Sequence, residues 1–101
     1  MDLTLKALSE PHRRAILQLV AFEQLSAGEI AEQFSISRPA VSQHLGVLKA
    51  AGLISEERKG TKRLYQTRPE GFTDLRAYID SFWDESLMRL KKLVESSEAK
   101  N

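Results

Sequence analysis

The sequence predicts a mainly helical fold with a small β-hairpin wing: a winged helix-turn-helix with the element order α-α-α-α-β-β-α. Helical patterns on either side of residues 35–37 predict the helix-turn-helix. Strand-like segments around Gly60 predict the wing, and a long amphipathic segment near the C-terminus predicts the last helix. A chain of 101 residues has the length of one domain. We expect this domain, with dimerisation helices at both ends, over residues 1–95 and a disordered tail over residues 96–101.

The first two helices are predicted from apolar spacing and a start signal. Residues 3–8 contain three leucines that fit one or two helical turns. Ser9-Glu10-Pro11 predicts the start of the second helix, because proline fits a first turn where its missing N–H costs nothing. The apolar residues that then recur at helical spacing are Ala15, Ile16, Leu19 and Val20.

The next two helices begin at recognisable caps. Ser26 and Glu29 have the spacing of a capping box, which begins a short helix with Ile30, Ala31 and Phe34 inward. Ser37 is predicted to cap the fourth helix, and Gly52 to end it in a left-handed conformation. The predicted buried stripe of the fourth helix is Val41, Leu45 and Leu48.

The remaining elements are the wing and the last helix. Residues 53–58 and 62–67 are predicted strands around a connection at residues 59–61, and residues 68–71 form a break. The last helix is predicted over residues 72–94, with a length of about 35 Å. Its two neighbouring apolar stripes are Phe72, Leu75, Ile79, Phe82, Leu90 and Leu93, and Trp83, Leu87, Leu90 and Val94.

Composition excludes several classes of protein. No run of about 18 apolar residues is present, so we expect no membrane span. The N-terminus lacks the pattern of a signal peptide. The absence of cysteine excludes disulfides, thiolate ligands and thiol nucleophiles, and it fits a reducing compartment. We therefore expect a cytoplasmic, nucleoid-associated protein.

Positive charge is concentrated in the middle of the chain, although the net charge is only +1. Residues 35–68 hold seven Lys/Arg and two Asp/Glu, which gives +5, whereas residues 1–34 and 69–101 each carry −2. Attraction to an anion is local and decays within about 10 Å, so this distribution favours an anionic partner such as nucleic acid. Chance asymmetry of a solvated surface is the alternative.

The outward face of the fourth helix fits a DNA major groove. Small residues and short hydrogen-bonding groups occupy it, where a helix exposed only to water would favour Glu and Lys. We expect Arg38, Ser42 and Gln43 to contact base edges, because Gln pairs with adenine and Arg with guanine. We expect Ser37 and Lys49 to contact phosphates. The other residues assigned to this surface or its flanks are Pro39, Ala40, Gly46 and Ala50. An inert surface helix is the alternative.

The wing adds a second group of basic residues. Four cations lie within six positions, and after a recognition helix they are expected to contact phosphates or the adjacent minor groove, with Lys62 and Arg63 ahead of Arg58. A solvated loop is the alternative interpretation. The four residues are Arg58, Lys59, Lys62 and Arg63.

With these motifs in place, the sequence resembles the bacterial arsenic-repressor (ArsR/SmtB-type) winged-helix regulators. The motifs that carry the resemblance are PHRRAIL at residues 11–17, LSAGEIA at 25–31, SRPAVSQHL at 37–45 and AGLI at 51–54. The resemblance implies a homodimer joined through its terminal helices that binds an operator, usually as a repressor. It also implies DNA contacts from Arg38, Ala40, Ser42 and Gln43.

The chain departs from the metal-sensing members of that family. Thiol-type sensors carry cysteines on the helix represented here by Glu29–Phe34, and other members bind zinc-like ions between their C-terminal helices through His and carboxylates. This chain has no Cys, and His12 and His44 lie outside the last helix. The carboxylates that remain there, without imidazole, are Asp74, Asp80, Asp84 and Glu85. We therefore expect no metal and no cofactor.

The histidines and serines suggest no catalysis. We expect His44 to be half-buried and bonded to a neighbouring loop or a phosphate, and His12 to be exposed, with a phosphate contact or no role. Ser37 and Ser42 lack His/Asp partners at a diagnostic spacing. The five glycines form no phosphate-binding loop. We expect no enzymatic activity.

The wide apolar arc of the last helix predicts a homodimer interface, since a chain of this size covers little of such a surface by itself. A two-fold dimer implies an inverted-repeat operator. The alternatives are that the arc packs wholly within one chain or that it holds a small apolar ligand. The expected dimerisation residues are Leu5, Leu75, Ile79, Phe82, Trp83, Leu87 and Leu90.

Three functions remain open from the sequence. The first is a repressor of double-stranded DNA operators, including the possibility of autorepression. The second is a sensor of the same family that responds to a metal, a small ligand or an unidentified effector. The third is a winged helix that binds a protein partner in place of DNA.

Overall fold

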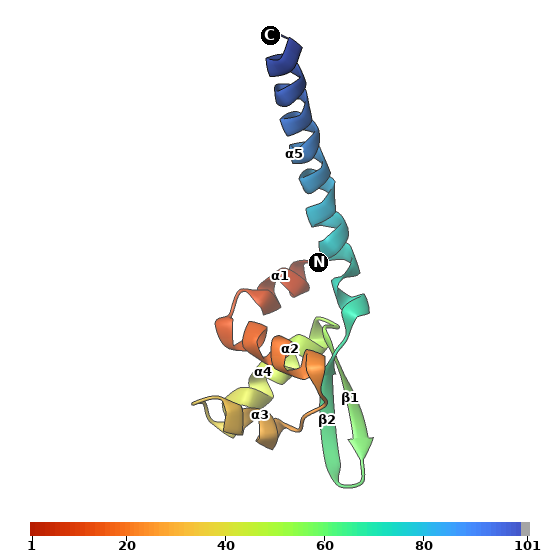
Figure 1. The fold of residues 1–101 in the computed structure, drawn as a ribbon. Coiled ribbons are helices and arrows are strands. Elements are labelled where there is room, and N and C mark those ends of the chain that lie inside the picture. Colours follow the sequence, from red (N-terminus) through yellow and green to blue (C-terminus); the bar gives the residue numbers. More distant parts are fainter. Residues whose placement is uncertain (100–101) are drawn as a thin grey trace.

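The fold was analysed in a computed structural model that describes residues 1–99, with the side chains of residues 1–97. The expected order of elements is confirmed, with one 3₁₀ turn added before the last helix (Figure 1). The elements are α1 (Asp2–Leu8), α2 (Pro11–Phe22), α3 (Ala27–Gln33), α4 (Arg38–Ala50), β1 (Ile54–Lys59), β2 (Lys62–Thr67), η1 (Pro69–Phe72) and α5 (Thr73–Ala99).

The helix starts follow the local signals in the sequence. Glu10 caps α2 by accepting a hydrogen bond from the Arg13 backbone N–H. The capping box of Ser26 and Glu29 is present at α3, and the Ser37 hydroxyl accepts from the Ala40 N–H at α4. Each side chain satisfies a backbone donor that has no partner within its helix, which fixes where the helix begins.

One hydrophobic core holds α1 to α4 together. The predicted stripe of α4 is fully confirmed as buried, whereas Ala15 and Leu19 of α2 are only half-buried and Leu17 joins the core in their place. The core also extends beyond the helices into the start of the wing. Its buried members are Ala7, Ile16, Leu17, Val20, Leu25, Ile30, Val41, Leu45, Leu48, Leu53 and Ile54.

The wing is an antiparallel hairpin paired from Ile54↔Thr67 to Lys59↔Lys62. Its connection is the two residues Gly60-Thr61, one shorter than the sequence suggests. Gly60 has φ +63°, and the positive angle at the first central position is the geometry of a tight hairpin turn that matches strand twist. Gly52, after α4, has the predicted left-handed conformation at φ +75°.

The wing is fixed to the helices by a bridge that the sequence does not signal. Leu25, just before α3, forms two backbone hydrogen bonds with Tyr65 of β2, at 3.2 and 2.8 Å. The Thr67 hydroxyl also donates to the Leu17 carbonyl at 2.6 Å. These contacts hold β2 against α2 and so set the position of the wing relative to α3 and α4.

The turn η1 directs α5 away from the body formed by α1–α4 and the wing. Gly71 approaches the turn after α4 so closely that a Cβ atom there would lie 2.1 Å from the Gly52 carbonyl oxygen. Only glycine fits such an approach without a backbone shift. Phe72 belongs to η1 and packs against the core, so its predicted place on the exposed stripe of the last helix was wrong.

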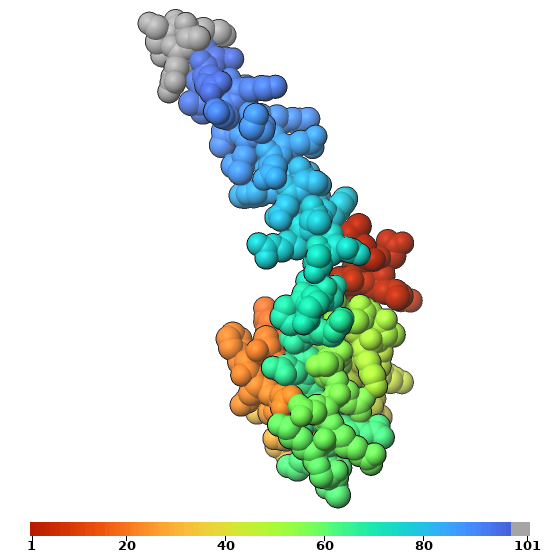
Figure 2. All heavy atoms as spheres, turned by 90° about the vertical axis from the view of Figure 1, so that its right-hand side faces the viewer, coloured from red at the N-terminus to blue at the C-terminus, as the bar shows by residue number. Residues whose placement is uncertain are grey.

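Helix α5 leaves the body as a rod of about 40 Å (Figures 1 and 2). The residues beside its base are those of the N-terminal helix α1 (Figure 2). The helix extends to Ala99, so residues 96–99 of the predicted tail are helical, and residues 100–101 lie outside the described part of the chain. Within residues 1–99, no helix is long and apolar enough to cross a membrane.

Candidate nucleic-acid interface

The outward face of α4 is exposed as predicted. Gln43 and Ser42 lie on the solvent side, opposite the buried stripe. Ala40 is half-buried. The other predicted members of this surface are exposed: Arg38, Pro39, Gly46, Lys49 and Ala50. The helix therefore offers a face with little steric bulk, the condition for its backbone to approach base edges.

A shallow hollow of about 540 Å³ runs beside this face. Gln43, Gly46 and Ala50 of α4 line it together with Arg13 of α2. Because Gly46 and Ala50 have minimal side chains, the hollow follows the helix backbone. The sequence predicted the α4 side of this hollow but not the contribution of α2.

A second groove, of about 450 Å³, lies between the starts of α3 and α4 and the wing. Arg38, Lys62 and Arg63 supply cations to its lining, and Glu29 and Glu32 supply carboxylates. The Arg38 guanidinium lies against α3, with its Cζ atom 3.7 Å from where a Cβ on Gly28 would be. The structure thus brings the predicted α4 and wing cations to one groove.

One carboxylate of this groove, Glu29, is favoured in its charged form. Glu29 accepts a hydrogen bond from the Ser26 backbone N–H, and this bond, with the nearby Lys62 ammonium, lowers the pKa of Glu29. An anionic ligand in the groove therefore meets the Arg38 and Lys62 edge more favourably than the α3 edge.

Glu56 of β1 pairs with two of the predicted DNA-binding cations. The Lys49 ammonium donates to Glu56 Oε2 at 2.5 Å, and Arg63 Nε lies 3.4 Å from Glu56 Oε1. The hydrogen bond from Lys49 lowers the pKa of the Glu56 carboxyl. In the DNA-free chain these cations are thus held by an internal carboxylate, which no sequence signal indicated.

A similar polar network joins the wing to Gln24, in the segment before α3. Gln24 donates to Glu57 at 2.7 Å and accepts from the Lys59 ammonium at 3.2 Å. Its partners lie more than 30 positions away in the chain. Arg58 and Lys62 are exposed, and neither forms an ion pair with another residue in the part of the chain whose side chains are described.

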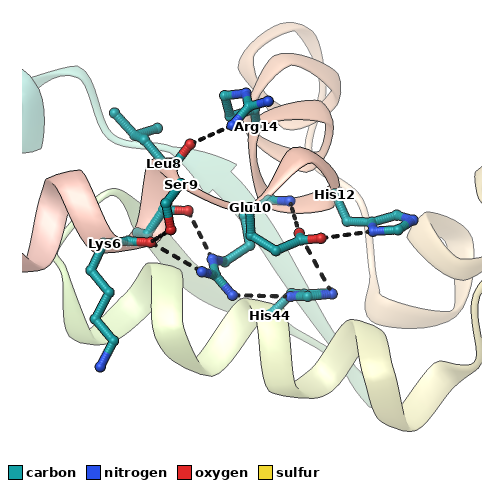
Figure 3. A network of polar contacts seen from close by, with 9 residues as sticks. Lys6, Leu8, Ser9, Glu10, His12, Arg14 and His44 are labelled. Atoms are coloured by element: carbon teal, nitrogen blue, oxygen red, sulfur yellow. Dashed lines mark hydrogen bonds and ion pairs between the residues drawn. The ribbon is translucent and has the colours of Figure 1, made fainter.

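The two histidines meet at the junction of α2 and α4. His44 is half-buried, as expected, and accepts from Arg13 Nη1 at 3.4 Å. His12 is exposed, as expected, and it makes two contacts that the sequence did not predict: its Nδ1 lies 3.0 Å from Glu10 Oε1 (Figure 3), and its ring stacks on that of His44. The His12 hydrogen bond lowers the pKa of Glu10. This cluster was missed because 32 positions separate the histidines in the chain.

The apolar residues predicted for dimerisation are largely open to solvent. Phe82 is 46% and Trp83 59% exposed, and Leu75 is half-buried near the base of the rod. Leu5 of α1 is exposed as well. The same open face continues along the rod through Tyr78, Ile79, Leu87, Met88, Leu90, Leu93 and Val94. The alternative that this arc packs within its own chain is contradicted.

Comparison with known sequences identifies related regulators. The helix-turn-helix domain family matches residues 8–57. The HTH-type transcriptional regulator Rv2034 of Mycobacterium tuberculosis is 43% identical over 95 residues, covering 94% of this chain and 89% of that protein. The transcriptional repressor SdpR of Bacillus subtilis is 50% identical over 60 residues, covering 59% of this chain and 67% of that protein.

Solved structures share the whole fold. A possible transcriptional regulator for arsenical resistance superimposes with a TM-score of 0.73 at 41% identity, covering 89% of this chain and 93% of that one. The ArsR-like transcriptional regulator from Rhodococcus sp. RHA1 gives 0.75 at 28% identity, covering 94% and 90%. These relatives are named as regulators, not enzymes. With its helix-turn-helix, basic wing and projecting last helix, the chain belongs to the ArsR/SmtB family of DNA-binding winged helix-turn-helix transcriptional regulators.

Proposed function

We propose that the chain is a repressor that binds an inverted-repeat operator as a homodimer joined through α5 and α1. The observation that carries this proposal is the open apolar face of α5, which projects beyond the body as an amphipathic rod with no core of its own. Leaving several large apolar side chains in water is costly, at about 25 cal/mol for each Å² of apolar surface. A second copy of the same face would remove that cost symmetrically.

Continuity of the apolar surface supports α1 as part of the same interface. Leu3 and Leu5 expose their side chains on α1, which lies beside the base of α5 (Figures 1 and 2). A partner rod packed along α5 would reach this helix. The proposed interface residues are Leu5, Leu75, Ile79, Phe82, Trp83, Leu87 and Leu90.

The DNA contacts in this proposal divide by chemistry. Arg38, Ser42 and Gln43 contact base edges in the major groove, where Pro39 and Ala40 permit close approach. The Ser37 hydroxyl accepts from the Ala40 N–H, which leaves its own O–H available to donate to a phosphate. The residues that supply electrostatic attraction are Lys49, Arg58, Lys59, Lys62 and Arg63.

Two of these cations must change partners when DNA binds. Lys49 and Arg63 share Glu56 in the free chain, and a phosphate would compete with that carboxylate. Arg58 and Lys62 form no ion pair with a carboxylate among the described side chains, so a phosphate has no such partner to replace. We therefore assign the larger share of phosphate attraction to Arg58 and Lys62.

Repression follows if the operator overlaps a promoter, since a dimer over two major grooves excludes polymerase. The names of the relatives SdpR and the arsenical resistance operon repressor of Staphylococcus xylosus support this direction of regulation. Repression of its own gene is included in this proposal. The site of action would be the nucleoid, in the cytoplasm.

The proposal is tested by measuring assembly and operator symmetry together. Sedimentation equilibrium of the full chain at micromolar concentration should give a dimer. Selection from a random duplex library should yield an inverted repeat whose half-sites lie about 10 base pairs apart, or a multiple of that spacing. A monomer in solution, or a selected motif without two-fold symmetry, would contradict the homodimer proposal.

A further inference from the structure

A cluster of one carboxylate and two imidazoles lies at the junction of α2 and the recognition helix α4 (Figure 3). The ligand atoms offered by Glu10, His12 and His44 all lie within 4.8 Å of one another. Glu10 Oε1 is 3.0 Å from His12 Nδ1, and Glu10 Oε2 is 3.9 Å from His44 Nε2. Each carboxylate oxygen therefore faces a nitrogen of one of the two rings.

We propose that Glu10, His12 and His44 form a binding site for a divalent transition-metal ion, with Zn²⁺ the best match. Two imidazoles and one carboxylate are a common three-residue ligand set for zinc, with water as the fourth ligand. Nitrogen ligands also suit Co²⁺ and Ni²⁺, whereas Mg²⁺ and Ca²⁺ prefer oxygen alone. No Cys is required.

The geometry needs only a small contraction to accept zinc. Zinc binds nitrogen and oxygen at about 2.0–2.2 Å, so neighbouring ligand atoms in a tetrahedron lie about 3.4 Å apart. The separations in the cluster exceed this by at most about 1.4 Å. His12 is on the surface, with a 46% exposed side chain, and rotation about its side-chain bonds can close this gap.

The surroundings of the cluster favour this ligand set in two ways. The Arg13 backbone N–H donates to Glu10 Oε2 at 3.0 Å, which holds the carboxylate at the start of α2. The near-parallel stacking of the two rings, with centroids 5.8 Å apart, keeps both on the same side of Glu10. The ligands are thus oriented by backbone and packing before a metal arrives.

A bound metal would break one hydrogen bond of the Arg13 side chain. Its Nη1 donates to His44 Nδ1 in the metal-free chain. When His44 Nε2 binds a metal, Nδ1 carries the proton and repels that donor. Arg13 retains its bonds to the Ala7 and Lys6 carbonyls, at 2.8 and 3.1 Å, so the exchange loses only its longest contact.

Bound metal would link α2 to the recognition helix. His44 directly follows Gln43, so a metal bond would restrain the α4 turn that the proposed function places against DNA. Only this regulatory consequence depends on the proposed function. Metal binding itself is measured without DNA, so failure of the metal site and failure of the DNA-binding proposal are distinguishable.

The test uses the full chain without a histidine tag and with Co²⁺ as the spectroscopic probe. Titration of the wild type should produce visible absorption bands that saturate at one Co²⁺ per chain and disappear when Zn²⁺ is added. His12→Asn should weaken Co²⁺ binding at least about tenfold, and His44→Asn should do the same. Asp84→Asn, on the exposed surface of α5, is the matched control and should leave the titration unchanged.

His12→Asn is the decisive variant because its exposed side chain makes little contribution to folding, which circular dichroism verifies for each protein. The proposal is overturned if the wild type shows no saturable one-to-one bands. It is equally overturned if His12→Asn retains wild-type affinity, or if Asp84→Asn loses as much affinity as the histidine variants.

Discussion

The body and the α5 rod contain the same kinds of apolar side chain, but these side chains are buried in the body and exposed on the rod. In the body, residues such as Ile16, Ile30 and Leu48 have no exposed surface, because four helices and the wing surround them. Along α5, Phe82 and Trp83 remain about half exposed, because no other element within residues 1–99 covers them. An apolar stripe is therefore not itself a core; it becomes one only where another element covers it.

The body and the α5 rod also differ in the contacts that stabilise them. The body has long-range contacts among α2, α3, α4 and the wing, whereas the main contact of α5 within the chain is with the neighbouring turn η1. Isolated helices are marginal in water, since most helical stability in proteins comes from packing of the apolar face. The body should thus be stable within one chain, and the rod should depend on its partner.

The largest effect is expected in the core of the body. Leu48→Ala removes a side chain with no exposed surface and leaves a cavity, so the free energy of unfolding should fall by about 2–5 kcal/mol. Denaturant unfolding at constant protein concentration measures this loss. Val47→Ala, at the exposed neighbouring position, is the control and should cost less than about 1 kcal/mol. Equal losses would contradict the assigned position of the core.

A substitution on the apolar face of α5 should weaken association of the proposed dimer. Phe82→Ala removes two rings from each symmetric dimer, and we expect the dimer dissociation constant to rise by about 30-fold or more, which corresponds to about 2 kcal/mol. Sedimentation equilibrium measures this constant. The matched control is Phe22→Ala on α2, where the ring is 91% exposed and lies outside the proposed interface. A Phe82→Ala dimer of wild-type affinity would remove Phe82 from the interface.

A smaller effect is expected on the outward face of the recognition helix. Gln43→Ala should lose about 1–3 kcal/mol of binding to the selected operator and relax the preference at one base position. Fluorescence anisotropy with the operator and its single-base variants measures both changes. Gln18→Ala, an exposed glutamine on α2, should bind as the wild type does. Unchanged base preference in Gln43→Ala would exclude a role for Gln43 in specificity.

The wing should contribute affinity without specificity. Lys62→Ala removes two Lys62 side chains from each proposed dimer, so it should weaken binding to all duplexes alike and reduce the slope of log affinity against log salt by about 1.8, which is about 0.9 for each lost phosphate contact. Affinity measured at several salt concentrations, on operator and unrelated DNA, tests this. Lys91→Ala on α5 provides a charge-matched control. A loss confined to the operator would indicate a base contact instead.

The smallest effect is expected from pH. The hydrogen bond from Lys49 lowers the Glu56 pKa below its usual value of 4.5, so the pair stabilises the folded chain above the unfolded-state pKa. This stability is lost as pH falls through the folded pKa. Thermal unfolding between neutral pH and about pH 3 should therefore show a shallower decline for Glu56→Gln than for the wild type. Parallel declines would mean that the ion pair contributes nothing measurable.

Much of the fold could be predicted because its signals are local. Ser26 with Glu29, and Ser37 before Pro39, mark helix starts within a few residues of chain. The buried stripe of α4 follows from a spacing that any helix imposes on its own side chains. The exposed positions of Gln43 and Ser42 follow from the same periodicity, so the central part of the candidate site was predictable as well.

What escaped prediction depends on segments that are distant in the chain. Phe72 has the spacing of the α5 stripe. Because Gly71 lies close to Gly52, however, the Phe72 side chain packs against the core. The pairing of Lys49 with Glu56 could not be inferred, because Glu56 reaches Lys49 only once β1 lies against α4.

The sequence by itself determined where helices and strands begin, which faces are apolar and where positive charge gathers, since each depends on neighbours a few positions apart. Only the tertiary structure decided that Leu25 pairs with the wing and that His12 meets His44. The same holds for the α5 face that stays uncovered. These features depend on the relative placement of whole elements, which the packing of the shared core and the backbone contacts between them fix.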